Sequence, residues 1–181
     1  MIRPKSYERS TFSLWVLIMV LACLPKSLQG QRPLEDLKNY VAFSEQLHSC
    51  GTINTRDLQT LKTKGIESII SLIDENPSQT IMLKRKAEEI GLNFIHVPVS
   101  WKKPNLSSLA RFFSAMESAA QTKLLVHCRV NWRASAFVYL YQVYVQKVNE
   151  AEARAVLLSV WNPWKNKTWT QFFALAKEKF Q

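Results

Sequence analysis

One stretch of the sequence combines a nucleophilic side chain with groups that bind anions. The apolar residues 124–126 predict a short strand, Cys128 follows it, and the run from Arg133 to Lys147 predicts a helix. Backbone N–H groups in such a strand–loop–helix turn, together with the positive end of the helix dipole, bind a tetrahedral oxyanion. The same surroundings stabilise a thiolate, which is the nucleophilic form of cysteine. We therefore expect an oxyanion cradle in which Cys128 attacks and Arg133 holds two oxygens.

The remaining residues of this loop are candidate ligands of the same anion. We expect the anion to be surrounded by Arg129, Val130, Asn131, Trp132 and Ala134. Arg129 adds positive charge, and Trp132 is placed to shape the mouth of the pocket, whereas the other tryptophans are more typical of packing residues. The alternative for Cys128 is a small buried residue that ends a strand and has no chemical role.

The elements that must position this loop alternate between strands and helices. Short apolar runs bounded by glycine or proline predict strands at 66–73, 92–97 and 124–126. Longer runs predict helices at 56–64, 79–90, 106–121, 133–147, 150–160 and 168–180, and Thr55 and Asn105 are candidate N-caps. This alternation predicts an α/β fold of three layers, in which a mainly parallel central sheet carries helices on both faces.

Three loops are expected to meet at one rim of this sheet. Ligands of parallel sheets bind beyond the carboxyl ends of the strands. The loops at 74–77, 98–104 and 128–134 each follow a predicted strand and therefore converge there. The earlier residues 34–43 predict a packed segment, whose type the sequence leaves open.

The loop resembles the signature of the protein tyrosine and dual-specificity phosphatases, which reads His-Cys, a spacer, Arg, then Ser or Thr. The resemblance covers most of residues 39–173 and is closest to a bacterial exported phosphatase-like family. It rests also on Asn39-Tyr40, Cys50-Gly51, Gly65, Gly91-Leu92, Val97-Pro98-Val99 and Trp161-Asn162-Pro163. It implies that Cys128 is the nucleophile, that Arg133 binds phosphate, that His127 tunes the thiolate and that Ser135 helps the thiolate leave.

The sequence departs from that signature in its spacing. Four residues separate Cys128 from Arg133, one fewer than in the signature, and Ala134 occupies the usual arginine position. Asn131 stands where glycine is usual, and asparagine is the next most tolerant residue for a left-handed backbone. Because one helical residue turns a side chain by about 100°, the spacing changes where Arg133 points.

The general acid is the second departure. The resemblance implies an aspartate on the loop that protonates the leaving oxygen, but residues 98–104 contain no carboxylate. Asp74 and Glu75 follow another strand on the same rim, and we expect Asp74 to substitute, with Glu75 as the alternative acid. The alternative for both is an ordinary solvated turn.

Three functions remain open on these observations. The leading one is a cysteine-dependent phosphatase that hydrolyses phosphomonoesters through a phosphocysteine intermediate. The shortened spacing and the missing acid suggest a second, a pseudophosphatase that binds phosphorylated ligands without hydrolysis. The third is a rhodanese-like sulfurtransferase, because those enzymes resemble this loop in its spacing.

The composition agrees with an anionic ligand. The net charge of +10 favours anionic partners, and we expect a phosphorylated protein or a small phosphorylated molecule. The basic residues are spread along the chain without a dense run, so no nucleic acid is expected. Two cysteines beyond residue 30 and scattered histidines indicate neither a disulfide scaffold nor a zinc site. Thiolate and arginine chemistry requires no metal and no other cofactor.

Cys50 and His96 are more typical of interior residues than of catalysts. In an oxidising compartment, however, a Cys50–Cys128 disulfide is a possible switch of the site.

The first thirty residues differ from the rest. Basic residues precede an apolar run from Phe12 to Leu24, and a short polar stretch up to Gly30 follows. This order is typical of a secretory signal, and the run is shorter than the roughly 20 residues of a membrane-spanning helix. We expect a signal peptide at 1–30 and a phosphatase-like domain at 31–181, exported to a bacterial periplasm. The alternative is an uncleaved or lipidated N-terminal segment that anchors the chain to a membrane.

Overall fold

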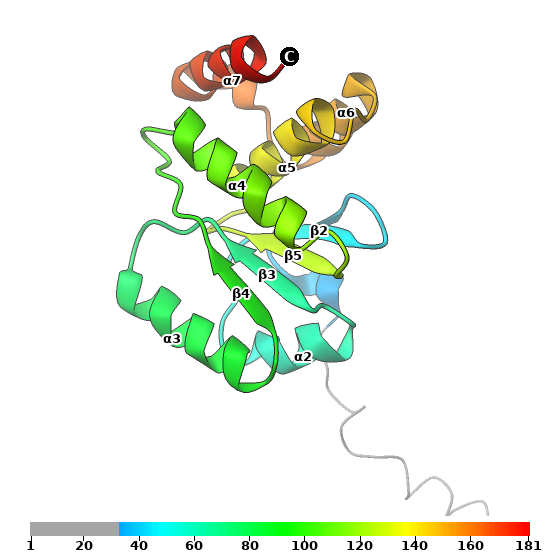
Figure 1. Cartoon of the computed structure of the whole chain (residues 1–181), viewed down its shortest axis with the longest axis vertical. Helices are drawn as coiled ribbons and strands as arrows, with labels where there is room; N and C mark the ends of the chain where they lie inside the picture. The colour runs from blue at the N-terminus through cyan, green and yellow to red at the C-terminus, as the bar shows by residue number, and fades with distance from the viewer. Residues whose placement is uncertain (1–32) are drawn as a thin grey trace, which may run out of the picture. The chain divides into compact units, whose positions relative to one another are not determined.

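A five-stranded sheet organises the computed structural model, which describes residues 33–181 (Figure 1). The predicted signal segment lies outside these residues. The strands are β1 (Val41–Ala42), β2 (Leu47–Cys50), β3 (Ser68–Ser71), β4 (Asn93–His96) and β5 (Leu124–His127). Their order is β1-β2-β5-β3-β4, and β1 alone runs antiparallel to its neighbour. The carboxyl end of β5 therefore lies in the middle of the sheet, where Cys128 follows it.

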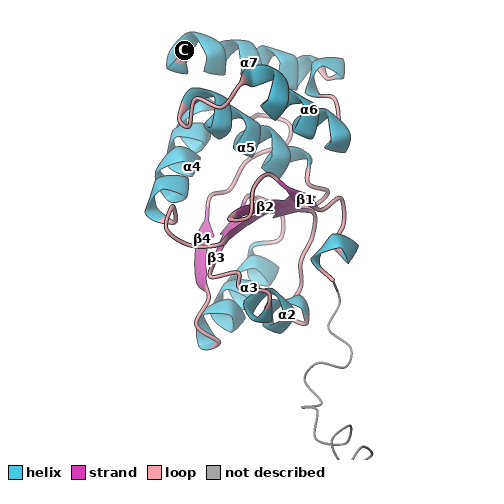
Figure 2. Cartoon of the chain, turned by 90° about the vertical axis from the view of Figure 1, so that its right-hand side faces the viewer, coloured by secondary structure: helices cyan, strands magenta, loops and turns pink. Residues whose placement is uncertain are grey.

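Helices cover both faces of the sheet, which confirms the predicted three-layer α/β fold. Figure 2 shows α2 (Asp57–Thr63) and α3 (Pro77–Glu89) against one face, and α4 (Leu106–Ser118) and α5 (Trp132–Tyr144) against the other. Beyond α5 lie α6 (Glu150–Val160), a 3-10 turn η3 (Pro163–Lys165) and α7 (Lys167–Phe180). Within residues 33–181, no helix has the length and apolar character needed to cross a membrane.

The register of the parallel strands divides the core into two clusters. Side chains at paired positions share a face, and successive positions alternate between faces. Ile69, Phe94 and Leu125 are paired and belong to the cluster under α2 and α3. Ile70 and Val126, one position later, belong to the larger cluster against α4 and α5. The same alternation places Cys50 in the cluster under α2 and α3 and Cys128 in the larger cluster.

Local hydrogen bonds explain where the helices begin. Asn105 caps α4 as predicted, because its Oδ1 accepts the N–H of Ser108 at 2.9 Å. The predicted Thr55 cap is wrong: α2 begins at Asp57, and the turn before it is held by Asn54, whose Oδ1 accepts the N–H of Arg56 at 2.9 Å. Asp57 completes that turn by accepting the N–H of Asn54 at 2.8 Å.

The N-terminal part of the domain contains the elements that the sequence left open. A 3-10 turn, η2 (Leu34–Asp36), is followed by β1 and β2. All four residues of β2 are buried, although two of them, His48 and Ser49, are polar. A buried strand with this composition has no apolar run, which is why the pattern did not indicate it.

The aromatic centre of the larger cluster gives a test of the fold. Phe137 of α5 is fully buried and contacts the rings of Phe112, Trp169 and Phe172. We expect Phe137→Ala to lower the free energy of unfolding by about 3–5 kcal/mol, because it removes buried surface and leaves a cavity. Urea denaturation measures this value. Leu175→Ala at a half-exposed position of α7 is the control, and an equal loss in both variants would contradict the assignment.

Candidate active site

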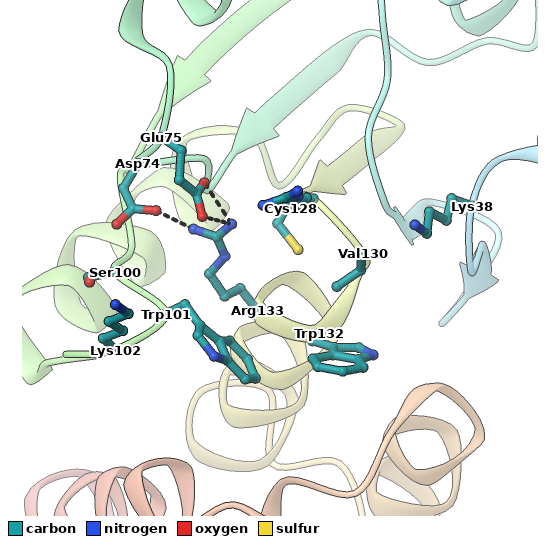
Figure 3. Close-up of a pocket in the computed structure, with 11 residues that line it drawn as sticks. Lys38, Asp74, Glu75, Ser100, Trp101, Lys102, Cys128, Val130, Trp132 and Arg133 are labelled. Carbon is teal, nitrogen blue, oxygen red and sulfur yellow. Dashed lines mark hydrogen bonds and ion pairs between the residues drawn. The ribbon is translucent and has the colours of Figure 1, made fainter.

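Cys128 lies at the carboxyl end of β5, where the chain turns into α5. Its backbone N–H donates to the carbonyl of Cys50 at 3.2 Å, and its side chain is buried. Figure 3 shows the sulfur directed into the space between Arg133 and Val130, above the start of α5. The predicted strand–loop–helix placement of the cysteine is therefore present.

Three carbonyls of the loop after Cys128 accept hydrogen bonds from side chains. The carbonyl of Arg129 accepts from Thr52 Oγ1 at 2.9 Å, and that of Val130 accepts from Asn39 Nδ2 at 2.9 Å. The carbonyl of Asn131 accepts from Ser135 Oγ at 2.6 Å. Because the N–H and C=O groups of a peptide unit point in opposite directions, engaged carbonyls leave the N–H side of the loop for a ligand.

Asn131 gives the loop its shape. Its φ of 66° places it in the left-handed region, as expected for the residue at the glycine position. Its side chain is buried, and Nδ2 donates to the carbonyl of Asn39 at 2.5 Å. Asn39 and residues 130–131 thus hold each other, since Asn39 donates back to Val130. This contact gives Asn39 a role in holding the loop that follows Cys128.

Arg133 contacts the two other loops of the rim and is almost fully buried. Nη1 donates to Asp74 Oδ1 at 2.5 Å and to the Val99 carbonyl at 2.8 Å, with a longer contact of 3.4 Å to the Leu72 carbonyl. Nη2 donates to both carboxylate oxygens of Glu75, at 3.0 and 2.9 Å. The guanidinium lies between Cys128 and the two carboxylates in Figure 3. The three predicted loops do converge, and Arg133 is the side chain that joins them.

Arg133 and the neighbouring acidic groups each stabilise the charged form of the other. Burial alone would lower the pKa of Arg133, but the neighbouring Cys128, Glu75 and Asp74 raise it above its ordinary value. Burial would likewise raise the pKa of Glu75, but the hydrogen bonds and charge of Arg133 hold it below its ordinary value. The arginine is therefore cationic and Glu75 anionic at neutral pH.

His127 and Ser135 have surroundings that restrict their roles. His127 is completely buried. Neither of its ring nitrogens has a hydrogen-bond partner within residues 33–181. Burial lowers the pKa of His127 to about 3, so the ring is neutral at physiological pH. Ser135 is also buried, and its hydroxyl donates to backbone carbonyls of the loop. In this state Ser135 supports the loop.

His127 is part of a polar row across the sheet. The register pairs it with Cys50 of β2 and with Ser71 of β3, which is in turn paired with His96 of β4. Because paired positions share a face, all four lie on the α2 and α3 side. Cys128 follows His127 and faces the opposite side, with the α4 and α5 cluster. Both thiols are free, and the sheet stands between them, so the structure does not contain the considered disulfide.

A pocket of about 660 Å³ opens above Cys128 (Figure 3). The predicted residues Asp74, Arg129, Val130, Trp132 and Arg133 line it, whereas Ala134 is buried behind the loop. Sequence reasoning named Glu75 only as an alternative acid and did not assign Lys38, Ser100, Trp101 or Lys102 to the site. The last three lie in the predicted rim loop 98–104, which was a usable signal, but nothing in the sequence indicated Lys38. No cluster of metal-ligating side chains is found among residues 33–181.

Comparison with known proteins agrees with this geometry. A family model described as a DSP-PTPase phosphatase fused to NAD+ kinase (PTP-NADK) matches residues 34–180. The chain belongs to this family. The resemblance to dual-specificity and tyrosine phosphatases is thus confirmed, and the PTP-NADK match gives no support to the sulfurtransferase alternative. A search of the curated proteins found no match.

Solved structures show the same fold. A candidate phosphatase (DUF442) from Shewanella putrefaciens CN-32 is 28% identical, with a TM-score of 0.69 over 81% of this chain and 96% of that one. P. aeruginosa TpbA, with a cysteine replaced by serine and in complex with phosphotyrosine, is 13% identical, with a TM-score of 0.58 over 74% and 82%. The catalytic domain of the S. cerevisiae PP-IP phosphatase SIW14 is 15% identical, with a TM-score of 0.60 over 77% and 85%.

The buried neutral His127 predicts a specific pH dependence of stability. In the unfolded chain histidine binds a proton near pH 6.5, whereas the folded ring binds one only near pH 3. Between these values the unfolded state holds the extra proton, so His127 makes stability fall as the pH falls, by at most about 1.4 kcal/mol per pH unit. Urea denaturation from pH 7 to pH 4 measures the slope. His127→Asn should lower this slope by up to about 1.4 kcal/mol per pH unit, which corresponds to the loss of one titrating proton. An unchanged slope would contradict a neutral buried ring.

Proposed function

We propose that this chain hydrolyses phosphomonoesters through a phosphocysteine intermediate. The observation that supports it most directly is Cys128 in the loop between β5 and α5, beside the cationic Arg133 and facing a pocket. The Cys128 thiolate attacks phosphorus, the S–P bond forms, and the bond from phosphorus to the leaving oxygen breaks. Water then attacks the phosphocysteine, the S–P bond breaks, and inorganic phosphate leaves. The N-terminal end of α5 stabilises the transferring phosphoryl group.

Arg133 takes part by exchanging ligands. Its Nη atoms are occupied by Asp74 and Glu75, yet its guanidinium lies beside Cys128. A bound phosphate dianion presents the same type of acceptor as a carboxylate, so it can replace one of them without leaving the cation unpaired. The buried carbonyls of Val99 and Leu72 keep the guanidinium in place during this exchange.

Asp74 is the candidate general acid in this scheme. Asp74 and Glu75 are the carboxylates of the pocket lining. Glu75 accepts two hydrogen bonds from Arg133 and has a lowered pKa, which suits an anion better than a proton donor. When phosphate takes the Arg133 Nη1 position, Asp74 is released from the guanidinium and faces the same pocket. In this scheme Asp74 donates the proton to the leaving oxygen.

The pseudophosphatase is the second candidate, and the same ion pair favours it. If Arg133 stays with Asp74 and Glu75, the site keeps an anion-binding loop but lacks both a free arginine and an acid. Phosphate binding without turnover would then be the whole activity. Assays of hydrolysis distinguish the two candidates.

The first test is turnover of p-nitrophenyl phosphate by the reduced full-length chain. We expect hydrolysis that falls to the background rate in Cys128→Ser, because the weaker nucleophile forms no phosphoenzyme. Cys50→Ala is the control for loss of a buried thiol and should retain activity. Absence of turnover in folded wild-type protein that still binds phosphate would replace the phosphatase with the pseudophosphatase.

The role of Asp74 is tested by the leaving group. Asp74→Asn should lower kcat for phenyl phosphate by about 10²–10⁴-fold, because phenolate leaves poorly without a proton. The loss should be much smaller for p-nitrophenyl phosphate, whose leaving group needs less protonation. Glu75→Gln is the matched control and should show no dependence on the leaving group. An equal loss of kcat for both substrates in Asp74→Asn would mean that Asp74 acts through Arg133 and does not donate the proton.

A further inference from the structure

Trp132 is an unusual residue for the loop that binds the phosphate. It is the first residue of α5, lines the pocket, and remains 39% exposed. Single exposed apolar side chains are common on protein surfaces. Among the exposed large apolar residues of the described chain, however, only Trp132 lines this pocket. Figure 3 draws its indole below Cys128 and Val130, where the ring forms part of the pocket wall.

The indole of Trp132 is held in place by two other tryptophans. Trp161 stacks on it with ring centroids 5.4 Å apart and an interplanar angle of 16°. Trp161 Nε1 also donates to the carbonyl of Trp132 at 2.9 Å. Trp101, whose ring lies 5.4 Å from that of Trp132, forms the adjoining part of the pocket wall. A ring fixed in this way loses little conformational entropy when a planar ligand stacks on it.

Three cations besides Arg133 line the same pocket as this aromatic wall. Lys38, Lys102 and Arg129 line the pocket, and none of them forms an ion pair with another described residue. Lys102 follows Trp101 directly in the rim loop, so a positive charge lies next to the aromatic wall. In Figure 3, Lys38 and Lys102 lie on opposite sides of Cys128.

The pocket is larger than a phosphate group alone would fill. A volume of about 660 Å³ lies within the range of roughly 300–1,000 Å³ for sites of drug-sized ligands. Phosphate and a single small ring leave much of it unfilled. The wall therefore fits a larger ligand that has a planar ring system and a second anionic group.

We propose that the site takes a nucleotide that carries a second phosphate group. This inference rests on the proposed function, because it places the reacting phosphate over Cys128. The base stacks on Trp132, and the second phosphate pairs with Lys102. An inositol phosphate would supply the charges but no ring to stack, and a phosphotyrosine side chain would supply the ring but no second phosphate. Trp132 and Lys102 are the specificity-determining residues.

Titration calorimetry on the full-length Cys128→Ser variant tests the proposal without any need for turnover. The probes are adenosine 3′,5′-bisphosphate, phenyl phosphate, a phosphotyrosine peptide, inositol hexakisphosphate and inorganic phosphate. We expect the adenosine bisphosphate to have the lowest Kd, at least about 10-fold below that of inorganic phosphate, as stacking of one base provides. A lower Kd for the peptide or for inositol hexakisphosphate would overturn the proposal in favour of that class.

Substitutions in the same background assign the two contacts. Trp132→Leu should raise the Kd of the adenosine bisphosphate about 10-fold and leave that of inorganic phosphate unchanged. Lys102→Ala should raise the Kd of the adenosine bisphosphate and leave that of phenyl phosphate unchanged. The matched controls are Lys103→Ala, next to Lys102 but outside the pocket lining, and Trp164→Phe, which packs against Arg154. If Trp132→Leu raised the Kd of all ligands equally, the substitution would only distort the loop. That result would contradict stacking of the base on Trp132.

Turnover separates this proposal from the one on which it rests. If wild-type protein hydrolyses aryl phosphates and the adenosine bisphosphate neither binds nor reacts, the nucleotide proposal fails and the phosphatase stands. If the adenosine bisphosphate binds to the Cys128→Ser variant as expected and no ester is hydrolysed, the phosphatase fails and the nucleotide site stands.

Discussion

The buried guanidinium of Arg133 is the interaction on which the rest of the site depends. It belongs to α5, yet its hydrogen bonds end on the residues after β3 and on the loop after β4. Because the cation is almost fully buried, it requires acceptors on all sides, and the backbone carbonyls and carboxylates supply them. The requirement to satisfy one charge thus fixes three loops around Cys128.

The alternation of the central strands places chemistry on one face and support on the other. Cys128 faces α4 and α5, where the pocket and the aromatic wall lie. His127, one residue earlier, faces α2 and α3 together with Cys50, Ser71 and His96. His96 at the edge of this row is exposed, and its Nε2 is hydrogen-bonded to the carbonyl of Ile73 at 2.7 Å. Ser71 and His127 are buried, and within residues 33–181 the Ser71 hydroxyl and the His127 ring nitrogens have no hydrogen-bond partner, which costs stability. The two neighbouring residues therefore face different sides of the sheet: Cys128 faces the side of the pocket, and His127 faces the layer that supports it.

The sequence predicted those parts that depend on local patterns. The strands and helices from residue 56 onward, the cap at Asn105 and the left-handed Asn131 follow from apolar runs and side-chain chemistry. The rim could be predicted because strand ends of a parallel sheet converge. The partners of Arg133 could not, since they depend on where α5 points its first turn relative to loops about 60 residues away in sequence. Lys38 and β2 were missed for a similar reason. β2 takes its place by pairing with the distant β5, and the carbonyl of Lys38 accepts the N–H of Gly51, which follows β2.

The position of Cys50 has a consequence for damage by oxidants. A nucleophilic thiol that meets peroxide forms a sulfenic acid, and a nearby second thiol can rescue it by forming a disulfide. Here the other cysteine of the described domain is buried beneath the sheet, on the side away from the pocket. Oxidised Cys128 therefore has no internal thiol within residues 33–181 to condense with. A disulfide that rescues it must therefore form with a thiol that enters the pocket from solution.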